Sequence, residues 1–399
     1  MELLRGTTTT GTGTDDRWVA VGHHGGPDAR TAATAATRDA LAGGDARLLV
    51  VFCSETYDLD ELLAGVSTAA PGVPVVGCST AGEISATGPG DAGVVVMALG
   101  GPGFTVATAA ARADGGRLRD ASATAARCVE QVGASPHRVL LLLTDGLAGD
   151  QQEVVRGAYQ TVGAEVPLVG GCAGDGLKMT GTFQLHGGEV LSNAVVAAAI
   201  GSVAPIGIGV RHGWRRVGEP MMVTSSAGNR VHLLDDAPAL DVYLDRLGAP
   251  ADARNEPAAF TRFALTHPLG LSRRSGEEVR FVAEADFAER ALVCIAQVPQ
   301  GGQAWIMEGD DDSVLVATDA ACSEAIGALG GRPPLGLLAF DCIARRGVLG
   351  DAGIEREVGR ISSFAGGAPV AGFYTYGEIA RTTGVSGFHN QTLVVLALA

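Results

Sequence analysis

The chain has 399 residues and a formal net charge of −15, with 46% hydrophobic and 18% charged residues. This length suggests two or three domains, and the composition is that of a folded globular protein rather than a disordered one. The acidic balance, with only short basic pairs such as Arg215-Arg216, argues against a nucleic-acid partner, because clustered Lys and Arg supply most of the affinity for phosphate backbones.

The start of the chain predicts a disordered lead and no targeting signal. Residues 1–16 are rich in Thr and Gly and lack the apolar core of a secretory signal. The longest apolar runs, at 195–200 and 393–398, are far shorter than the roughly 20 residues that a membrane helix needs. Seven cysteines without CxxC spacing fit a reducing compartment. We therefore expect a cytoplasmic protein without membrane insertion.

From residue 48 onward, one order of segments occurs three times: an apolar strand, a helix, a strand opened by Pro, a Gly-rich turn with an acid, and a closing apolar strand. The first copy has these strands at 48–53, 73–84 and 94–99, with a helix at 60–67. The second has strands at 139–144, 166–176 and 194–200. The third has strands at 335–342, 368–380 and 393–398, with a helix near 354–364. The repeated unit is therefore β-α-β-loop-β.

The turns of the first and third copies align without a gap, as PVVGCSTAGEI and PVAGFYTYGEI. So long a match is unlike chance and indicates internal duplication. The second copy needs a one-residue gap, and there Asp175 takes the place of the acid. The aligned identical pairs are Pro74/Pro369, Val75/Val370, Gly77/Gly372, Thr80/Thr375, Gly82/Gly377, Glu83/Glu378 and Ile84/Ile379.

Between the second and third copies, residues 221–234 predict a hairpin that turns at Ala227-Gly228-Asn229. A helix follows from Asp236 to near Gly248, then strands at 291–297 and 303–307 and a helix within 313–328. We expect a domain boundary near residue 230, which separates 17–230 from 231–399. The predicted fold class is α/β, with two related halves whose mixed β-sheets are covered by helices.

Several segments together resemble one known family: GCSTAGEI in the first half, and LDDAPALDVY, AFDCIARRG, GFYTYGEIA and GFHNQTLVVLAL in the second. They are similar to the FIST-N and FIST-C domains of bacterial signal-transduction proteins, and the likeness covers nearly the whole chain after Trp18. The resemblance implies a FIST-N-like domain over 17–230 and a FIST-C-like domain over 231–399.

The resemblance also implies a function, which is small-ligand binding in a sensory domain for signal transduction. The ligand expected from it is a small polar metabolite such as an amino acid. Some members of the family are haem proteins that sense nitric oxide, so haem is a second expectation. No segment resembles a fused output module, and we therefore expect the signal to pass to a separate partner, such as a histidine kinase or a cyclic-di-GMP enzyme.

The Gly-rich turns are the first candidate ligand site, because turns after buried strands leave main-chain N–H groups free to donate. Acids there would accept from an ammonium or hydroxyl group, and the tyrosines would form an apolar wall with a polar tip. The alternative is that these residues only hold the turns. The candidates are Cys78, Ser79, Thr80, Glu83, Asp175, Tyr374, Tyr376 and Glu378.

The ends of the first strands are the second candidate site and contain Asp145, Asp341, Cys342 and Arg345. Asp341 and Arg345 would clamp a zwitterion, since a guanidinium holds a carboxylate with two hydrogen bonds. The alternative is an internal ion pair. Cys342 is either a reactive thiol or a small buried apolar residue.

His389 and Asn390 open the last strand and are the third candidate. The histidine is a ligand contact, an axial haem ligand or a structural residue. For haem, His186, His212 and His232 are equally available, and no CxxCH attachment site is present in the sequence.

An uncharacterised hydrolase or transferase is the remaining alternative. GCSTA approximates a G-x-S-x-G nucleophile elbow around Ser79, but the residues after it are poor helix formers. Cys342 is the other candidate nucleophile, and Glu83 with Glu378 would do acid–base work if their turns met. The sequence contains no HExxH, GxxxxGK[ST] or strand-borne GxGxxG motif. We therefore assign neither catalytic nor metal-binding residues.

Overall fold

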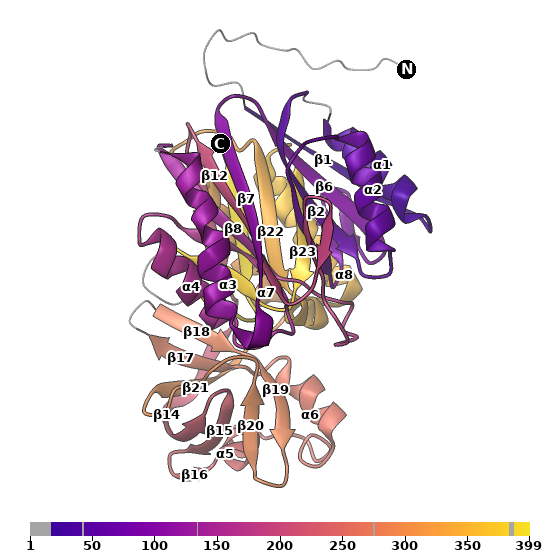
Figure 1. The fold of residues 1–399 in the computed structure, drawn as a ribbon. Coiled ribbons are helices and arrows are strands. Elements are labelled where there is room, and N and C mark those ends of the chain that lie inside the picture. The colour runs from indigo at the N-terminus through magenta and orange to yellow at the C-terminus, as the bar shows by residue number, and fades with distance from the viewer. Residues whose placement is uncertain (1–16, 42–43, 134, 274–275, 383–386) are drawn as a thin grey trace.

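The computed structural model describes residues 17–399 except 42–43, 134, 274–275 and 383–386, so the expected lead over 1–16 lies outside the described residues. Figure 1 shows a larger body above a smaller one. The predicted mixed α/β fold is confirmed. Each of three copies of one unit contains the expected β-α-β-loop-β order, preceded by one more strand and helix, and of these additions only the helix within 313–328 of the third copy was predicted.

The three copies together form the larger body. The first contains β1 (Trp18–Gly25), α1 (Ala29–Ala40), β2 (Ala46–Ser54), α2 (Leu59–Ala69), β3 (Val75–Thr80), β4 (Glu83–Ser85), β5 (Gly88–Gly90) and β6 (Gly93–Gly100). The second contains β7 (Phe104–Arg112), α3 (Leu118–Ala126), β8 (His137–Thr144), α4 (Gln152–Val162), β9 (Leu168–Cys172), β10 (Gln184–His186), β11 (Glu189–Leu191) and β12 (Ala194–Ser202). The third contains β13 (Ile206–Arg211), α7 (Asp311–Gly327), β22 (Gly336–Cys342), α8 (Ile343–Ala365), β23 (Val370–Thr375), β24 (Glu378–Arg381), β25 (Phe388–His389) and β26 (Leu393–Leu398).

Each copy builds a six-stranded mixed sheet that another copy completes. In the first sheet β2 runs parallel to β3 and antiparallel to β6, while β1 and the β10–β11 hairpin of the second copy take the outer positions. The second sheet receives β24–β25 from the third copy, and the third sheet receives β4–β5 from the first. The strand exchange therefore links the three sheets in a closed cycle.

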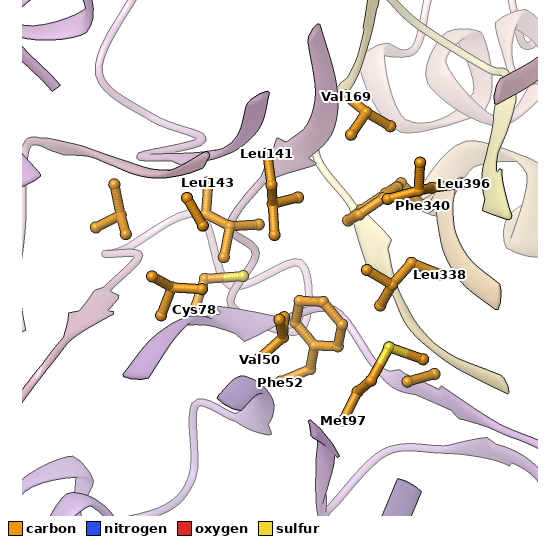
Figure 2. Packing of buried hydrophobic residues seen from close by; sticks show 14 of the residues in the cluster. Val50, Phe52, Cys78, Met97, Leu141, Leu143, Val169, Leu338, Phe340 and Leu396 are labelled. Carbon is orange, nitrogen blue, oxygen red and sulfur yellow. The ribbon is translucent and has the colours of Figure 1, made fainter. Parts of the chain in front are cut away.

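The inner faces of all three sheets share one apolar core, shown in Figure 2. Side chains alternate along β2, so that Val50 and Phe52 point into this core. Phe52 packs against Phe373 of the third sheet with ring centroids 4.7 Å apart, and Phe340 packs against Phe373 at 5.8 Å. This shared core brings the ends of the three sheets, and the turns that follow them, to the same region.

Helices cover the outer face of each sheet: α1 and α2 the first, α3 and α4 the second, α7 and α8 the third. Their starts follow ordinary capping chemistry. Asp58 accepts from the first free amides of α2, and Asp310 with Ser313 forms a capping box at α7. None of the described helices is long and apolar enough to cross a membrane.

The smaller body is inserted in the third copy, between β13 and α7. The predicted hairpin and the helix after it are confirmed as β14–β15 and α5. The boundary expected near residue 230 falls at the turn between β14 and β15 and stays a prediction. The elements are β14 (Arg215–Ala227), β15 (Arg230–Leu234), β16 (Ala237–Pro238), α5 (Ala239–Arg246), α6 (Pro257–Ala264), β17 (Leu269–Arg273), β18 (Gly276–Arg280), β19 (Val282–Asp286), β20 (Ala291–Cys294) and β21 (Gln303–Glu308).

Candidate functional site

The three Gly-rich turns meet where the sheets exchange strands, and main-chain hydrogen bonds join them. Tyr374 N donates to Gly82 O at 2.8 Å, and Ala81 N donates to Tyr374 O at 3.0 Å. Cys172 N donates to Gly377 O at 2.8 Å in the same way. The N–H groups that were expected to be free for a ligand are therefore used between the turns.

Glu83 holds its turn from inside the protein. Thr80 Oγ1 donates to Glu83 Oε1 at 2.5 Å, and Gly93 N donates to Glu83 Oε2 at 3.0 Å. Thr80 Oγ1 also accepts from the Gly82 amide at 3.2 Å. These contacts match the alternative in which the repeated pattern of turn residues holds the turn itself.

Glu378 repeats this arrangement in the third copy. Thr375 Oγ1 donates to Glu378 Oε1 at 2.5 Å, and the amide and hydroxyl of Thr392 donate to Glu378 Oε2 at 3.1 and 2.7 Å. Burial raises the pKa of both Glu83 and Glu378 to about 7, although these hydrogen bonds oppose the rise.

Ser79, Asp145 and Cys78 also have only internal neighbours. Ser79 Oγ donates to Gly174 O at 2.8 Å and accepts from Phe183 N at 3.0 Å. Asp145 accepts from two main-chain amides and one threonine hydroxyl at 2.7 to 2.9 Å. Cys78 packs in the shared core. The structure does not bring these three residues to a cavity with the other candidates.

Asp341 and Arg345 form a fully buried ion pair, with Arg345 Nε 2.7 Å from Asp341 Oδ1. Arg345 also donates to Glu357 at 2.5 Å and to Thr318 at 2.9 Å. Burial and the charge of Glu357 raise the pKa of Asp341 well above its ordinary value. This geometry is that of the internal ion pair considered above, rather than of an open clamp.

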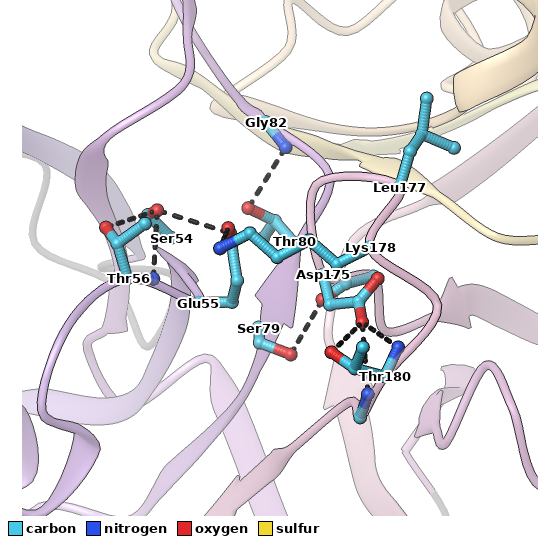
Figure 3. Close-up of polar contacts among 12 residues, drawn as sticks. Ser54, Glu55, Thr56, Ser79, Thr80, Gly82, Asp175, Leu177, Lys178 and Thr180 are labelled. Atoms are coloured by element: carbon cyan, nitrogen blue, oxygen red, sulfur yellow. Dashed lines mark hydrogen bonds and ion pairs between the residues drawn. The ribbon is translucent and has the colours of Figure 1, made fainter.

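Asp175 differs from the two glutamates because it holds a loop rather than a short turn (Figure 3). Its carboxylate accepts from the amides of Met179, Thr180 and Gly181 at 3.0, 2.7 and 3.0 Å. Tyr376 OH donates to the same carboxylate. Burial raises the pKa of Asp175, but these donors outweigh it and lower the pKa to about 2. Asp175 is therefore ionised throughout the neutral range.

The loop after Asp175 is strained and exposes apolar side chains. Leu177 and Met179 have φ of 65° and 55°, a left-handed conformation that costs an ordinary residue about 1 kcal/mol or more. Their side chains are 61% and 57% exposed. Leu177 N donates to Tyr376 OH at 2.7 Å, and Lys178 pairs with Glu55 at 2.9 Å. Backbone strain and exposed apolar side chains thus occur together in one hydrogen-bonded loop.

These exposed side chains line a cavity of about 280 Å³ between the two bodies, which we call the seam cavity. The larger body contributes the strained loop, Tyr376, Asn390 and the start of α8 from Cys342 onward, and the smaller body contributes α6 and two strand-flanking residues. Its large apolar wall residues are Leu177, Met179, Leu265, Phe281, Ile295 and Ile343. Of the predicted site residues, the structure thus brings together Cys342, Tyr376 and Asn390.

Asn390 is the polar group of this cavity that lacks a protein partner. It is 2% exposed, and its Oδ1 has no hydrogen-bond partner among the described residues. Thr261 and Tyr376, which also line the cavity, already donate to Pro257 O and Asp175. A buried unpaired amide oxygen is unfavourable by about 1–3 kcal/mol, so a bound donor would stabilise it.

A second, more polar hollow of about 710 Å³ adjoins the seam cavity and shares Gly146, Ile295 and Tyr376 with it. Its charged lining includes Arg156 and Glu153, which pair with each other. The two hollows are therefore parts of one cleft between the bodies, with apolar and polar ends.

His389 lies apart from the seam cavity, in a polar hollow that also contains His212. His389 is bonded to the Ala380 carbonyl through Nε2 at 2.9 Å, and His212 Nδ1 accepts from Trp214 N at 3.0 Å. Burial lowers the pKa of both imidazoles, that of His212 to about 4.

These surroundings fit haem poorly. The hollow with the two histidines is also lined by Glu277, Glu278 and Glu324, which pair with Arg216, Arg280 and Arg211, so the described part of its wall is largely charged and offers the haem ring no large apolar face. The seam cavity has no histidine among its described lining residues. We therefore assign no haem site to these residues.

Catalysis by a serine or cysteine requires a nearby base, and among the described residues Ser79 has none, whereas the Cys342 thiol hydrogen-bonds to the buried Glu378 carboxyl. The two hydrogen bonds of Ser79 go to main-chain groups of residues 174 and 183. Burial raises the pKa of the Cys342 thiol well above its ordinary value, and the Glu378 charge adds to the rise. Cys342 therefore lines the seam cavity as a protonated, uncharged thiol.

Sequence reasoning missed the apolar wall of the cavity. Leu177 and Met179 stand between glycines in GDGLKMTG, where large apolar side chains serve no strand or helix pattern. Two large apolar residues in a glycine-rich loop were therefore the one sign in the sequence that this loop lines a cavity. Residues such as Phe281 and Ile295 gave none, because only the docking of the smaller body brings them to this place.

Comparison with protein families gives matches that cover nearly the whole chain. The FIST N domain matches residues 47–237, and the FIST C domain matches residues 239–381.

Individual relatives have low sequence identity to this chain. An uncharacterized protein of Mycobacterium tuberculosis is 25% identical, over 94% of this chain and 97% of its own length. An uncharacterized protein of Methanocaldococcus jannaschii is 28% identical, over 36% of this chain and 30% of its own length. Among solved structures, cyanuric acid hydrolase from A. caulinodans aligns over 96% of this chain and 99% of its own, with 12% identity and a TM-score of 0.35.

Proposed function

The chain belongs to the FIST family, and from that premise we propose that it is a ligand-binding sensory protein whose ligand occupies the seam cavity. The observation that carries the proposal is the cavity itself, which has walls from both bodies and a buried, unpaired Asn390. Ligand pockets are typically apolar, lie between domains and carry few polar groups, and the seam cavity has all three properties.

Binding at this place would act on the orientation of the two bodies. If the two bodies can adopt two relative orientations, a ligand shifts the equilibrium toward the orientation that it binds more tightly. The size of the shift is set by the ratio of its affinities for the two orientations. The smaller body is joined to the larger by two connections, between β13 and β14 and between β21 and α7. A ligand that contacts both α6 and α8 therefore favours one orientation of the bodies.

The altered orientation is the signal in this proposal, and a separate protein reads it. A histidine kinase or a cyclic-di-GMP enzyme is the partner that the family resemblance suggests. Haem and catalysis receive less support, for the reasons of geometry given above.

A pair of glycines in α8 provides the test. Gly347 lines the cavity, and a Cβ there would make ordinary contact with Leu265 at 3.7 Å, so Gly347→Leu fills the cavity with little backbone strain. Gly359 lies in the same helix with open space around it, so Gly359→Leu is the matched control.

The measurement is ligand-observed NMR with a library of fragments of up to about 15 non-hydrogen atoms, a size set by the cavity volume. We expect binders whose affinity falls at least tenfold in Gly347→Leu and stays unchanged in Gly359→Leu. Native mass spectrometry of freshly purified protein should show the same pattern for any molecule carried through purification. The proposal fails if no fragment binds, or if the binders are insensitive to Gly347→Leu.

A further inference from the structure

The seam cavity contains enough chemistry to restrict the class of its ligand. None of the described residues that line it carries a charge. Its wall is formed by leucine, isoleucine, methionine and phenylalanine side chains, and the Cys342 thiol lies at the start of α8 as a further neutral group. A charged ligand would lose its hydration on entering without gaining an opposite charge, which is strongly unfavourable.

The hydrogen-bonding capacity of the wall is equally restricted. Tyr376 OH is occupied by Asp175 and Leu177, and Thr261 donates to main-chain carbonyls. The carboxamide of Asn390 is left as the polar anchor, because its Oδ1 is buried without a partner among the described residues. A carboxamide accepts and donates at the same end, so it pairs best with an amide or a hydroxyl group.

The size of the cavity sets a third limit. A cavity of roughly 150 Å³ holds benzene, so the 280 Å³ seam cavity accommodates roughly a dozen non-hydrogen atoms. The adjoining polar hollow offers no unpaired counter-charge from Arg156, because that residue is paired with Glu153. The exposed Asp150 also lines that hollow, so the restriction to uncharged groups applies to the part of the ligand inside the seam cavity.

The geometry points to a compact, uncharged and mostly apolar ligand, aromatic or branched, that bears one amide or hydroxyl group bonded to Asn390. This inference rests on the proposed function and specifies the ligand class of the same site. It departs from the amino acid expected from the family resemblance, because a zwitterion would place two charges against an uncharged wall.

Four probes of similar shape test this class: phenylacetamide, phenylacetate, phenylalanine and toluene. Titration calorimetry or NMR should show phenylacetamide binding at least tenfold more tightly than phenylacetate or phenylalanine. Toluene should bind more weakly than phenylacetamide because it lacks the group that Asn390 recognises. Equal or tighter binding of either charged probe overturns the inference.

Substitution of the anchor separates its role from general apolar binding. Asn390→Leu should weaken phenylacetamide about tenfold and leave toluene unchanged or tighter. Asn255→Leu, at an exposed asparagine of the smaller body, should change neither affinity. Asn390→Ala is the second variant should the leucine variant fail to fold. An unchanged ratio of the phenylacetamide and toluene affinities in a folded Asn390 variant contradicts the inference.

The two proposals fail in different ways. If none of the four probes binds, but library fragments do and Gly347→Leu excludes them, the ligand class is wrong and the proposed function stands. If phenylacetamide binds equally well to wild type and Gly347→Leu, both the site and its ligand class are wrong.

Discussion

Equivalent turns in the three copies hold their acids in opposite ways. Glu83 and Glu378 each lie at the first residue of a short exchanged strand, where burial raises the pKa to about 7. Asp175 precedes a loop that reaches β10 only at Gln184, and its several donors lower the pKa to about 2. The same position of the repeat therefore holds a carboxyl group that titrates near neutral pH in two copies, Glu83 and Glu378. In the third it holds Asp175, which is ionised throughout the neutral range.

This difference indicates how one copy of a repeated unit comes to line a cavity while the other copies do not. The two glutamate turns use their polar atoms to join the sheets, and their hydrogen bonds are internal. The aspartate turn uses its charge to hold strained backbone, and the loop so held presents Leu177 and Met179 to the seam cavity. The divergent copy thus contributes apolar side chains to the wall of the seam cavity, while the other two copies keep the turns that join the sheets.

Loss of the Asp175 carboxylate should have the largest effect. Asp175→Ala removes the acceptor for three amides, one threonine hydroxyl and Tyr376, and we expect the free energy of unfolding to fall by about 4 kcal/mol. Phenylacetamide binding should be lost because the loop wall is no longer held. Urea denaturation checks the first effect. In the control Asp150→Ala, an exposed aspartate that accepts from the Gln152 amide, the loss should stay near 1 kcal/mol.

Glu83 and Glu378 should affect how the free energy of unfolding depends on pH. Each has an ordinary pKa of 4.5 and a folded pKa of about 7, so between these values the folded chain keeps a proton that the unfolded chain has released. The contribution of each carboxyl to stability therefore decreases by about 3 kcal/mol as pH rises from 4.5 to 7, and it is constant above and below that window.

Chemical denaturation of wild type and Glu378→Gln across this window measures the effect. Compared with wild type, the variant should lack the decrease of about 3 kcal/mol that Glu378 contributes, because Glu83, Asp341 and His212 titrate alike in both chains. Glu165→Gln, at a side chain that is 86% exposed, should retain the wild-type slope. A Glu378→Gln slope equal to that of wild type would show that this carboxyl titrates normally.

Two tyrosines of one turn should respond oppositely to the same substitution. Tyr376→Phe removes a hydroxyl that donates to Asp175 and accepts from Leu177, so we expect a loss of about 1–2 kcal/mol and weaker probe binding. Tyr374 OH is buried without a hydrogen-bond partner among the described residues, so Tyr374→Phe should be neutral or stabilise by up to about 1 kcal/mol. Thermal unfolding of the two variants measures the difference, and equal effects would contradict the distinction between the bonded Tyr376 hydroxyl and the unbonded Tyr374 hydroxyl.

Local patterns in the sequence predicted most of the individual elements. Buried strands such as β2, β8 and β22 are continuous apolar runs, and the alignment of Thr80-Ala81-Gly82-Glu83 with Thr375-Tyr376-Gly377-Glu378 predicted two equivalent turns. Helices α1 and α3 escaped prediction because their buried faces are mainly alanine, which gives little contrast with polar neighbours.

Long-range pairing could not be predicted. The exchanged strands β4 and β10 have three residues each, too few for an alternating pattern, and each finds its partner in another copy. For the same reason the sequence placed Tyr376 and Asn390 among many candidates, without showing that these two share a cavity with Cys342. That juxtaposition depends on the exchange and on the docking of the smaller body.

The closed cycle of exchanged strands has a consequence for biosynthesis. When the first copy leaves the ribosome, β3 still lacks β10, and β4 lacks β23, where Glu83 will pair with Phe373 near the other end of the chain. Unpaired strand edges attract other chains, and contacts so distant in sequence form slowly. The nascent chain must therefore keep its early strand edges protected until the last copy is made, and the wall of the seam cavity, which contains Tyr376 and Asn390 of that last copy, is the final part to be assembled.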